Sequence, residues 1–197
     1  LPKAELAREV AVVEKMGIEV RYNTKVSRDI SIKDIQNSFD AVFVAVGAHL
    51  GRSLGISDEE ANGVINGLDF LRSVVVGSPV KVGKKVFVIG GGNVAIDVAL
   101  TARRLGAGEV HMVCLEKWDE MPAHKWEIDQ AVEEGVIIHP SWGPLRIDAP
   151  TGSVRGIEFK RCTAVFDEQG RFNPRFDEDT TIYHEADTII IAIGQAM

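Results

Sequence analysis

Three consecutive glycines follow a run of apolar residues, and this arrangement could hold a phosphate group. Residues 86–89 are all apolar, as in a strand buried on both faces, and Gly90, Gly91 and Gly92 come directly after them. Glycine adopts backbone angles closed to other residues, so the main chain there could approach a pyrophosphate. The charge of that group would be met by the N–H groups that a helix start leaves free. The turn therefore predicts phosphate binding.

The residues after the turn complete a dinucleotide-binding pattern. Asn93 and Val94 open the expected helix, and Ala95 fills the third small position of G-x-G-x-x-G/A, where helix and strand pack closely. A second apolar strand, residues 110–115, ends at Glu116, where a carboxylate would bind the hydroxyls of a ribose. The sequence thus predicts that these residues bind a dinucleotide. A glycine turn with a purely structural role is the alternative.

Charge and composition exclude several classes of function. The 197 residues carry 22 Lys and Arg against 29 Asp and Glu, with no basic block for nucleic acid or an anionic membrane. No apolar stretch is long enough to insert into a bilayer. Cys114 and Cys162 lie far apart and form no CxxC, which favours buried thiols in a reducing, cytoplasmic compartment. The five histidines have no metal-ligand spacing, so no metal site is expected.

Apolar strands alternate with helices along most of the chain, as is typical of an α/β fold. We expect a Rossmann-like, doubly wound and mainly parallel sheet over residues 84–195, with a three-stranded antiparallel meander inserted from about residue 144 to residue 183. Residues 49–83, rich in glycine, are interpreted as an interdomain connection. The expected helices cover residues 2–16, 68–75 and 125–134, and the expected strands cover residues 18–22, 40–48, 136–138, 145–147, 154–166, 181–183 and 186–195.

One short pattern occurs twice. The spacing Asp-x-x-x-x-Ala-x-Gly appears at residues 40–47 and again at residues 187–194, each time around a β-branched strand. The copies are too far apart for a solenoid repeat, and they indicate one terminal strand in each of two similar domains. We expect Ala45, Gly47 and Gly194, near the tips of these strands, to contact cofactors. An ordinary central strand ending in glycine would explain either copy alone.

Five segments together resemble the two-dinucleotide-domain flavoproteins of the pyridine nucleotide-disulfide oxidoreductase type. In detail they resemble the small (beta) subunit of glutamate synthase and its FAD-dependent, iron–sulfur-linked relatives. The resemblance covers essentially the whole chain, and it implies an NAD(P)-binding domain at residues 84–195 and part of an FAD domain at residues 1–48. The segments are LPKAELAREV near the start, FDAVFVAVGA at 39–48, VIGGGNVAIDVALTARRLGA at 88–107, DEMPA at 119–123 and ADTIIIAIGQ at 186–195.

The resemblance implies hydride transfer from NAD(P)H to FAD, and then electron transfer to iron–sulfur or partner-subunit acceptors. The cofactors perform this chemistry and the protein positions them. Asp97 matches the place where related flavoproteins carry an acidic residue near the nicotinamide, although a carboxylate interacting with the helix dipole is an equal alternative. The family's earlier glycine turn for FAD and its cysteine-rich cluster region have no counterpart in this sequence. We therefore expect a middle fragment, inactive alone, that purifies without FAD.

One departure from the family pattern bears on the choice of nucleotide. Members that use NADPH resemble VYRRSREEMPA, whereas this chain reads VCLEKWDEMPA, so Leu115, Glu116 and Trp118 replace arginines that would pair with the 2′-phosphate. A carboxylate repels that phosphate and accepts from two hydroxyls, which favours NAD over NADP, although Lys117 could still bind the phosphate. A non-catalytic nucleotide-binding module and an S-adenosylmethionine-dependent methyltransferase stay open as alternatives.

Overall fold

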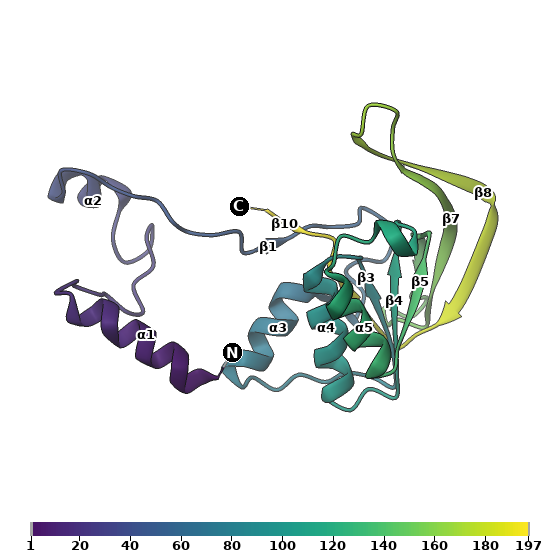
Figure 1. Cartoon of the computed structure of the whole chain (residues 1–197), viewed down its shortest axis with the longest axis horizontal. Helices are drawn as coiled ribbons and strands as arrows, with labels where there is room; N and C mark the ends of the chain where they lie inside the picture. The colour runs from purple at the N-terminus through teal and green to yellow at the C-terminus, as the bar shows by residue number, and fades with distance from the viewer. Residues whose placement is uncertain (1, 197) are drawn as a thin grey trace. The chain divides into compact units, whose positions relative to one another are not determined.

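The computed structural model describes residues 2–196, which divide into a smaller unit up to Val46 and a larger one from Gly47 onward. Within these residues no helix is both long and apolar enough to cross a membrane. The larger unit is built on a five-stranded parallel sheet (Figure 1). In spatial order its strands are β2 (Val64–Asn66), β9 (Thr188–Ile191), β3 (Lys85–Ile89), β4 (Glu109–Cys114) and β5 (Val136–Pro140).

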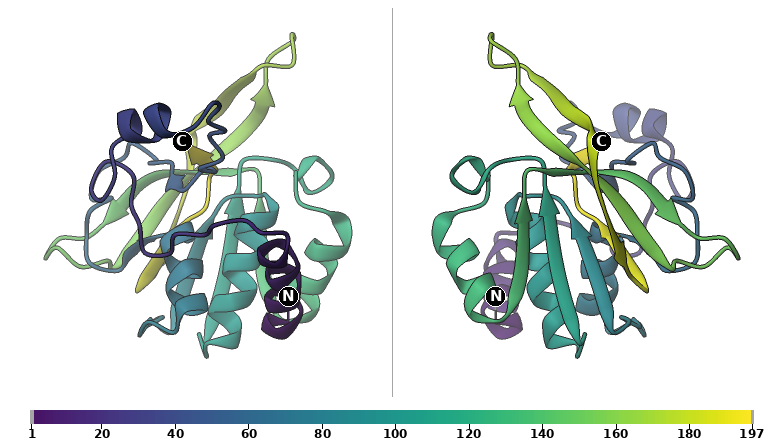
Figure 2. Two further views of the ribbon diagram at one scale, coloured as in Figure 1. Left: turned by 90° about the vertical axis from the view of Figure 1, so that its left-hand side faces the viewer. Right: turned by 90° about the vertical axis from the view of Figure 1, so that its right-hand side faces the viewer.

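Different layers cover the two faces of this sheet (Figures 1 and 2). On one side lie α3 (Gly67–Val76), α4 (Asn93–Arg104) and α5 (Lys125–Glu133), and on the other lies the antiparallel sheet of β6 (Trp142–Asp148), β7 (Gly156–Phe166) and β8 (Phe172–Glu185). Successive strand side chains point to opposite faces, so Val86 and Val88 pack against the helices while Phe87 and Ile89 pack against the meander. The predicted parallel sheet with its antiparallel excursion is confirmed.

The strand order fixes where a ligand can bind. From the central strand β3 the chain moves outward to β4 and β5, and after the meander it returns to β9 on the other side of β3. In open parallel sheets, ligands bind beyond the carboxyl ends of the strands at such a reversal. The glycine turn directly follows β3 and therefore lies at this position.

The segment interpreted as a connection contributes to the larger unit. The helix expected at residues 68–75 is present as α3, begun by Asn66, whose side chain accepts from Leu68 N at 3.0 Å. Phe70 is fully buried in the core under α3. The edge strand β2 was not expected, because three residues are too few to show an alternating pattern. A short antiparallel pair, β1 (Leu50–Gly51) with β10 (Gln195–Ala196), completes this unit.

The smaller unit holds two helices, α1 (Lys3–Lys15) and α2 (Ile32–Ser38). α1 confirms the helix expected at residues 2–16, and neither helix has a buried residue. The strands expected at residues 18–22 and 40–48 were wrong, because neither segment is in a strand. A strand exists only where its N–H and C=O groups find a neighbouring strand, and no such neighbour is present for these segments among the described residues.

Candidate functional site

The three glycines at the end of β3 lie in different surroundings, so a side chain would be tolerated differently at each. A Cβ placed on Gly90, whose φ is 142°, would lie 2.3 Å from Ala192 O, and one on Gly91 would lie 2.9 Å from both Cys114 Cβ and Glu116 Oε2. A Cβ on Gly92 would meet nothing within 4 Å. Packing of the protein itself therefore requires the first two glycines, whereas the third leaves open space beside the helix start.

That space belongs to a cavity of about 770 Å³ at the carboxyl edge of the parallel sheet. Its volume lies within the roughly 300–1,000 Å³ that small-molecule and cofactor sites occupy. Ala95 is fully buried, as expected for the small residue that packs beneath the turn. The predicted binding residues that line the cavity are Gly90, Gly91, Gly92, Asn93, Val94, Glu116 and Gly194.

The first turn of α4 offers N–H groups at the edge of this cavity. Ala95 N and Ile96 N both donate to Gly92 O, at 2.9 Å and 3.2 Å. The N–H groups of Gly92, Asn93 and Val94 have no acceptor within residues 2–196. Free N–H groups and the helix dipole together favour an anion at this point.

Glu116 is held beside the turn through its main chain. Ser141 N donates to Glu116 O at 2.8 Å, which ties the end of β4 to the end of β5. The Cys114 thiol, two residues earlier, also donates to Glu116 O, at 3.7 Å. Burial, and then the negative charge of Glu116, raises the pKa of Cys114 to about 12, so this thiol is neutral and unreactive. The carboxylate therefore sits on a fixed main chain next to Gly91.

The Met-Pro loop after Glu116 is attached to the glycine turn. Ala123 N donates to Gly91 O and His124 N donates to Asn93 Oδ1, both at 3.2 Å. A single 3₁₀ turn, η1 (Trp118–Glu120), lies between. Lys117 Nζ lies 3.4 Å from a carboxylate oxygen in this turn, and Lys117 does not line the cavity described here.

Three other predicted residues also lie outside the cavity lining of the described chain. Ala45 lies in the smaller unit and Gly47, with φ of 69°, begins the larger one. Asp97 is exposed on α4; partial burial and the nearby charge of Glu127 raise the pKa of its carboxyl, while Arg104 lowers it. Cofactor contacts by these residues stay predictions.

Two segments distant in sequence complete the cavity wall, and sequence reasoning missed both. One is the loop after β1, where Glu59 accepts from Ser53 Oγ at 2.8 Å, Leu54 N at 2.7 Å and Gly55 N at 2.9 Å. The other is the meander, whose apolar and basic side chains gave no local sign of a site. For the loop after β1, the sequence feature that could have indicated the site is Arg52, a basic residue between Gly51 and Gly55. The lining residues missed here are Arg52, Ser53, Leu54, Ile56, Trp142, Pro144, Lys160, Phe172 and Phe176.

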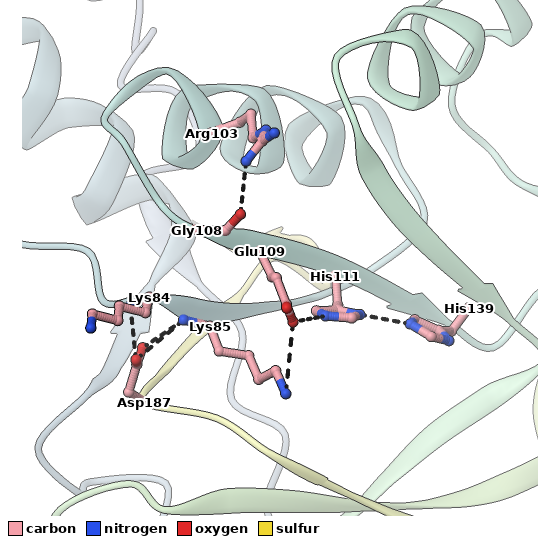
Figure 3. Close-up of polar contacts among 8 residues, drawn as sticks. All are labelled: Lys84, Lys85, Arg103, Gly108, Glu109, His111, His139 and Asp187. Carbon is pink, nitrogen blue, oxygen red and sulfur yellow. Dashed lines mark hydrogen bonds and ion pairs between the residues drawn. The ribbon is translucent and has the colours of Figure 1, made fainter.

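The opposite, amino edge of the sheet carries a network of paired groups (Figure 3). Asp187 Oδ2 accepts from Lys84 N at 2.8 Å and from Lys85 N at 3.2 Å. From this edge the contacts continue along the sheet towards its carboxyl end, where His111 Nδ1 lies 2.9 Å from His139 Nε2. Among the described residues, no group of three or more His, Cys, Asp or Glu is arranged to hold a metal ion.

Comparison with known proteins agrees with this geometry. A family model described as pyridine nucleotide-disulphide oxidoreductase matches residues 4–197. The chain is 38% identical to the NADPH-Fe(3+) oxidoreductase subunit beta of Geobacter sulfurreducens over 98% of this chain and 30% of the relative. It is 32% identical to the glutamate synthase [NADPH] small chain of Escherichia coli over 98% of this chain and 44% of the relative. The chain thus spans less than half the length of either relative.

A solved structure shares the fold. Mycobacterium tuberculosis FprA in complex with NADPH matches 88% of this chain and 54% of its own, with a TM-score of 0.74 and 19% identity. The match and the relatives confirm the resemblance to flavoprotein oxidoreductases of the glutamate synthase small-subunit type.

Proposed function

This chain belongs to the pyridine nucleotide-disulphide oxidoreductase family, and on that premise we propose that its cavity binds a nicotinamide dinucleotide that reduces FAD. The intact protein would be a flavin-dependent oxidoreductase of the glutamate synthase small-subunit type, passing electrons to iron–sulfur or partner-subunit acceptors. The nucleotide supplies the hydride when bound. The family gives no support to the methyltransferase alternative, because its description is that of a pyridine nucleotide enzyme.

One observation carries the proposal: the Glu116 carboxylate lies beside a glycine turn whose next N–H groups are unpaired within residues 2–196. The site therefore offers N–H donors to an anion and, a short distance away, a carboxylate to a diol. An adenosine diphosphate moiety carries both groups, in its pyrophosphate and its ribose. The open position at Gly92 leaves room for the anion. In this arrangement the first turn of α4 would hold the pyrophosphate, Glu116 would accept from the adenine ribose, and Gly194 would line the nicotinamide end of the site.

We propose that the preferred nucleotide is NADH. The carboxylate of Glu116 would accept from both ribose hydroxyls, and charge-assisted bonds of this kind contribute about 1.5–3 kcal/mol each. A 2′-phosphate would meet the same carboxylate with like charge. The two curated relatives carry NADPH in their names, but this chain differs from NADPH-using members at Leu115, Glu116 and Trp118.

Substitution of Glu116 tests both the binding of a dinucleotide and the preference for NADH. We expect Glu116→Arg to weaken NADH binding and strengthen NADPH binding, moving the ratio of their dissociation constants by at least about tenfold, or roughly 1.4 kcal/mol. Fluorescence titration of both nucleotides into both proteins measures this ratio. Glu133→Arg, an exposed carboxylate exchange on α5 outside the cavity lining, controls for net charge. A wild type that prefers NADPH, or an unmoved ratio, contradicts the assignment to NADH.

We also propose that residues 1–48 are part of an FAD domain, that residues 84–195 are the nucleotide domain, and that residues 49–83 connect the two while supplying β2 and α3 to the larger unit. Phe43, Val44 and Val46 are 92%, 65% and 64% exposed, and apolar side chains at this density normally pack against further protein. The chain alone should purify without flavin. Stoichiometric flavin absorbance in the purified chain would contradict this assignment.

A further inference from the structure

We propose that Lys160, on β7, lets this site accept a 2′-phosphorylated dinucleotide, so that Lys160 and Glu116 together set the preference between NADH and NADPH. The inference rests on the proposed function, because it concerns the same cavity. Glu116 favours the free diol, and Lys160 reduces the like-charge cost of a phosphate on that diol.

Two main-chain hydrogen bonds bring β7 to Glu116. Ser141, between β5 and β6, donates through its N–H to Glu116 O at 2.8 Å, and its own carbonyl accepts from Cys162 N at 2.9 Å. Lys160 lies two residues before Cys162 on this strand, and the β7–β8 pairing shifts register between Lys160 and Arg161. Burial, and further the charge of Glu116, raises the pKa of the Cys162 thiol, which agrees with Cys162 lying near this carboxylate.

The cross-strand register gives a second connection. Lys160 lies opposite Gly143 in the β6–β7 pairing. A Cβ on Gly143 would lie 2.8 Å from Leu115 Cδ2 and 2.5 Å from Phe176 Cε1. Leu115 directly precedes Glu116, so the same small region contains the end of β4, the start of β6 and the side chains around Lys160. Both Lys160 and Glu116 line the cavity.

The immediate partners of Lys160 leave its ammonium available. Its side chain is only 19% exposed, and Nζ lies 4.3 Å from the centroid of the Phe176 ring. The acidic partner is Glu178, with Oε1 at 3.0 Å and a side chain 68% exposed. An ammonium has three donors and one exposed carboxylate does not use them all. Lys160 can therefore donate to a phosphate without leaving its packed position.

The other cations near the cavity are less suited to this role. Lys117, on the loop after Glu116, is 61% exposed, pairs with Glu120 and is not part of the described lining. Arg52 does line the cavity, but its Cδ lies 3.8 Å from the position of a Cβ on Gly194, at the end of β9. β9 and β4 flank β3 on opposite sides. Arg52 therefore lies towards the nicotinamide end and Lys160 towards the adenosine end.

The test is Lys160→Met in the full chain, with titration of NADH, NADPH and adenosine 2′,5′-bisphosphate. Methionine keeps the apolar stem against Phe176 and removes the charge. We expect the dissociation constants of NADPH and the bisphosphate to rise at least about fivefold, while that of NADH changes less than about twofold. Lys160→Arg should restore the wild-type values, and Lys117→Met should change none of them.

The outcomes separate this inference from the proposed function. Binding of NADH to the wild type tests the proposed function alone. Equal weakening of NADH and NADPH by Lys160→Met would indicate a packing role and overturn the inference, as would an unchanged affinity for NADPH. Unfolding midpoints of all variants show whether the fold is intact, and Lys160→Arg separates loss of charge from loss of packing if Lys160→Met is destabilised.

Discussion

The two edges of the parallel sheet both border a hollow with charged walls, yet they use their polar groups differently. At the amino edge, in a hollow of about 840 Å³, Asp187 accepts from two main-chain N–H groups, and Glu109 lies 3.7 Å from Lys85 Nζ (Figure 3). At the carboxyl edge, in a hollow of about 770 Å³, the N–H groups of Gly92, Asn93 and Val94 and the Arg52 guanidinium have no protein partner among the described residues.

This difference shows which edge is adapted to a ligand. The volumes of the two hollows are similar, so volume alone does not identify a site. A partly buried main-chain N–H group costs free energy when it is unpaired, and the N–H groups of Gly92, Asn93 and Val94 have no acceptor within residues 2–196, so we expect them to bind a group from outside the chain. We expect substitutions at the amino edge to change stability, and most substitutions at the carboxyl edge to change nucleotide binding.

Gly90→Ala should give the largest effect and is the exception at the carboxyl edge, because this glycine serves packing. Its φ of 142° is unfavourable for alanine, and the new Cβ would lie 2.3 Å from Ala192 O. We expect the free energy of unfolding in urea to fall by about 3 kcal/mol or more. The matched variant Gly92→Ala should change stability by less than about 1 kcal/mol but weaken NADH binding, since its methyl group enters open space beside the α4 donors. Equal destabilisation by both variants would contradict this division.

Acid should weaken the fold through the histidines beneath the meander. Burial, and then the charges of His111 and His184, lowers the pKa of His139 to about 4, and burial lowers that of His184 as well. Since an unfolded histidine titrates near pH 6.5, the unfolded state binds more protons below that pH. Stability is then fully present above about pH 6.5 and is lost as the pH falls towards about 4, by at most about 2 kcal/mol for His139 at pH 5.

Urea unfolding across this pH range measures the effect. His139→Gln should flatten the dependence, because one proton fewer is taken up on unfolding. At pH 7 the same variant should bind NADH as the wild type does, since His139 is not among the residues that line the cavity. A wild-type stability that stays level between about pH 6.5 and 4.5 would contradict the assignment.

A smaller loss is expected from Asp187→Ala at the amino edge. The substitution removes the acceptor that lies 2.8 Å from Lys84 N. Loss of a charged acceptor of this kind costs about 1–2 kcal/mol, measured as the free energy of unfolding, and Asp187→Asn should recover part of it. The affinity for NADH should not change. A loss of affinity without a loss of stability would show that the two edges are not separate in function.

Much of the fold and the centre of the site could be predicted from sequence, because both are contiguous. The run from β3 through the glycine turn and α4 to Glu116 is one βαβ unit in which each local signal supports the next, and it lines much of the cavity. The meander was also predicted, although β8 extends over Phe172–Glu185 and is far longer than the three residues expected.

The remainder depends on contacts between distant segments. Lys160 reaches the cavity through the register between β6 and β7, and Arg52 reaches it because Arg52 N donates to Gly194 O at 3.1 Å. No local pattern encodes either contact. The strands expected at residues 18–22 and 40–48 failed for the same reason, since their apolar composition fits a strand but pairing depends on a neighbour.

The smallest effect is expected from Arg52→Gln, which should weaken nucleotide binding and leave the free energy of unfolding unchanged. The side chain is exposed and makes no ion pair within residues 2–196, so the fold does not depend on it. On the nicotinamide side of the cavity, an exposed positive charge contributes about 0.5–1 kcal/mol to the binding free energy by attracting the anionic dinucleotide, so NADH and NADPH should both bind about two- to fivefold more weakly. Arg72→Gln on α3, exposed and outside the lining, is the matched control.

Since salt screens exposed charges, the difference in affinity between wild type and Arg52→Gln should shrink as ionic strength rises. If the loss persists unchanged at high salt, Arg52 acts through loop conformation, and charge at the carboxyl edge contributes less to binding than the free N–H groups of α4.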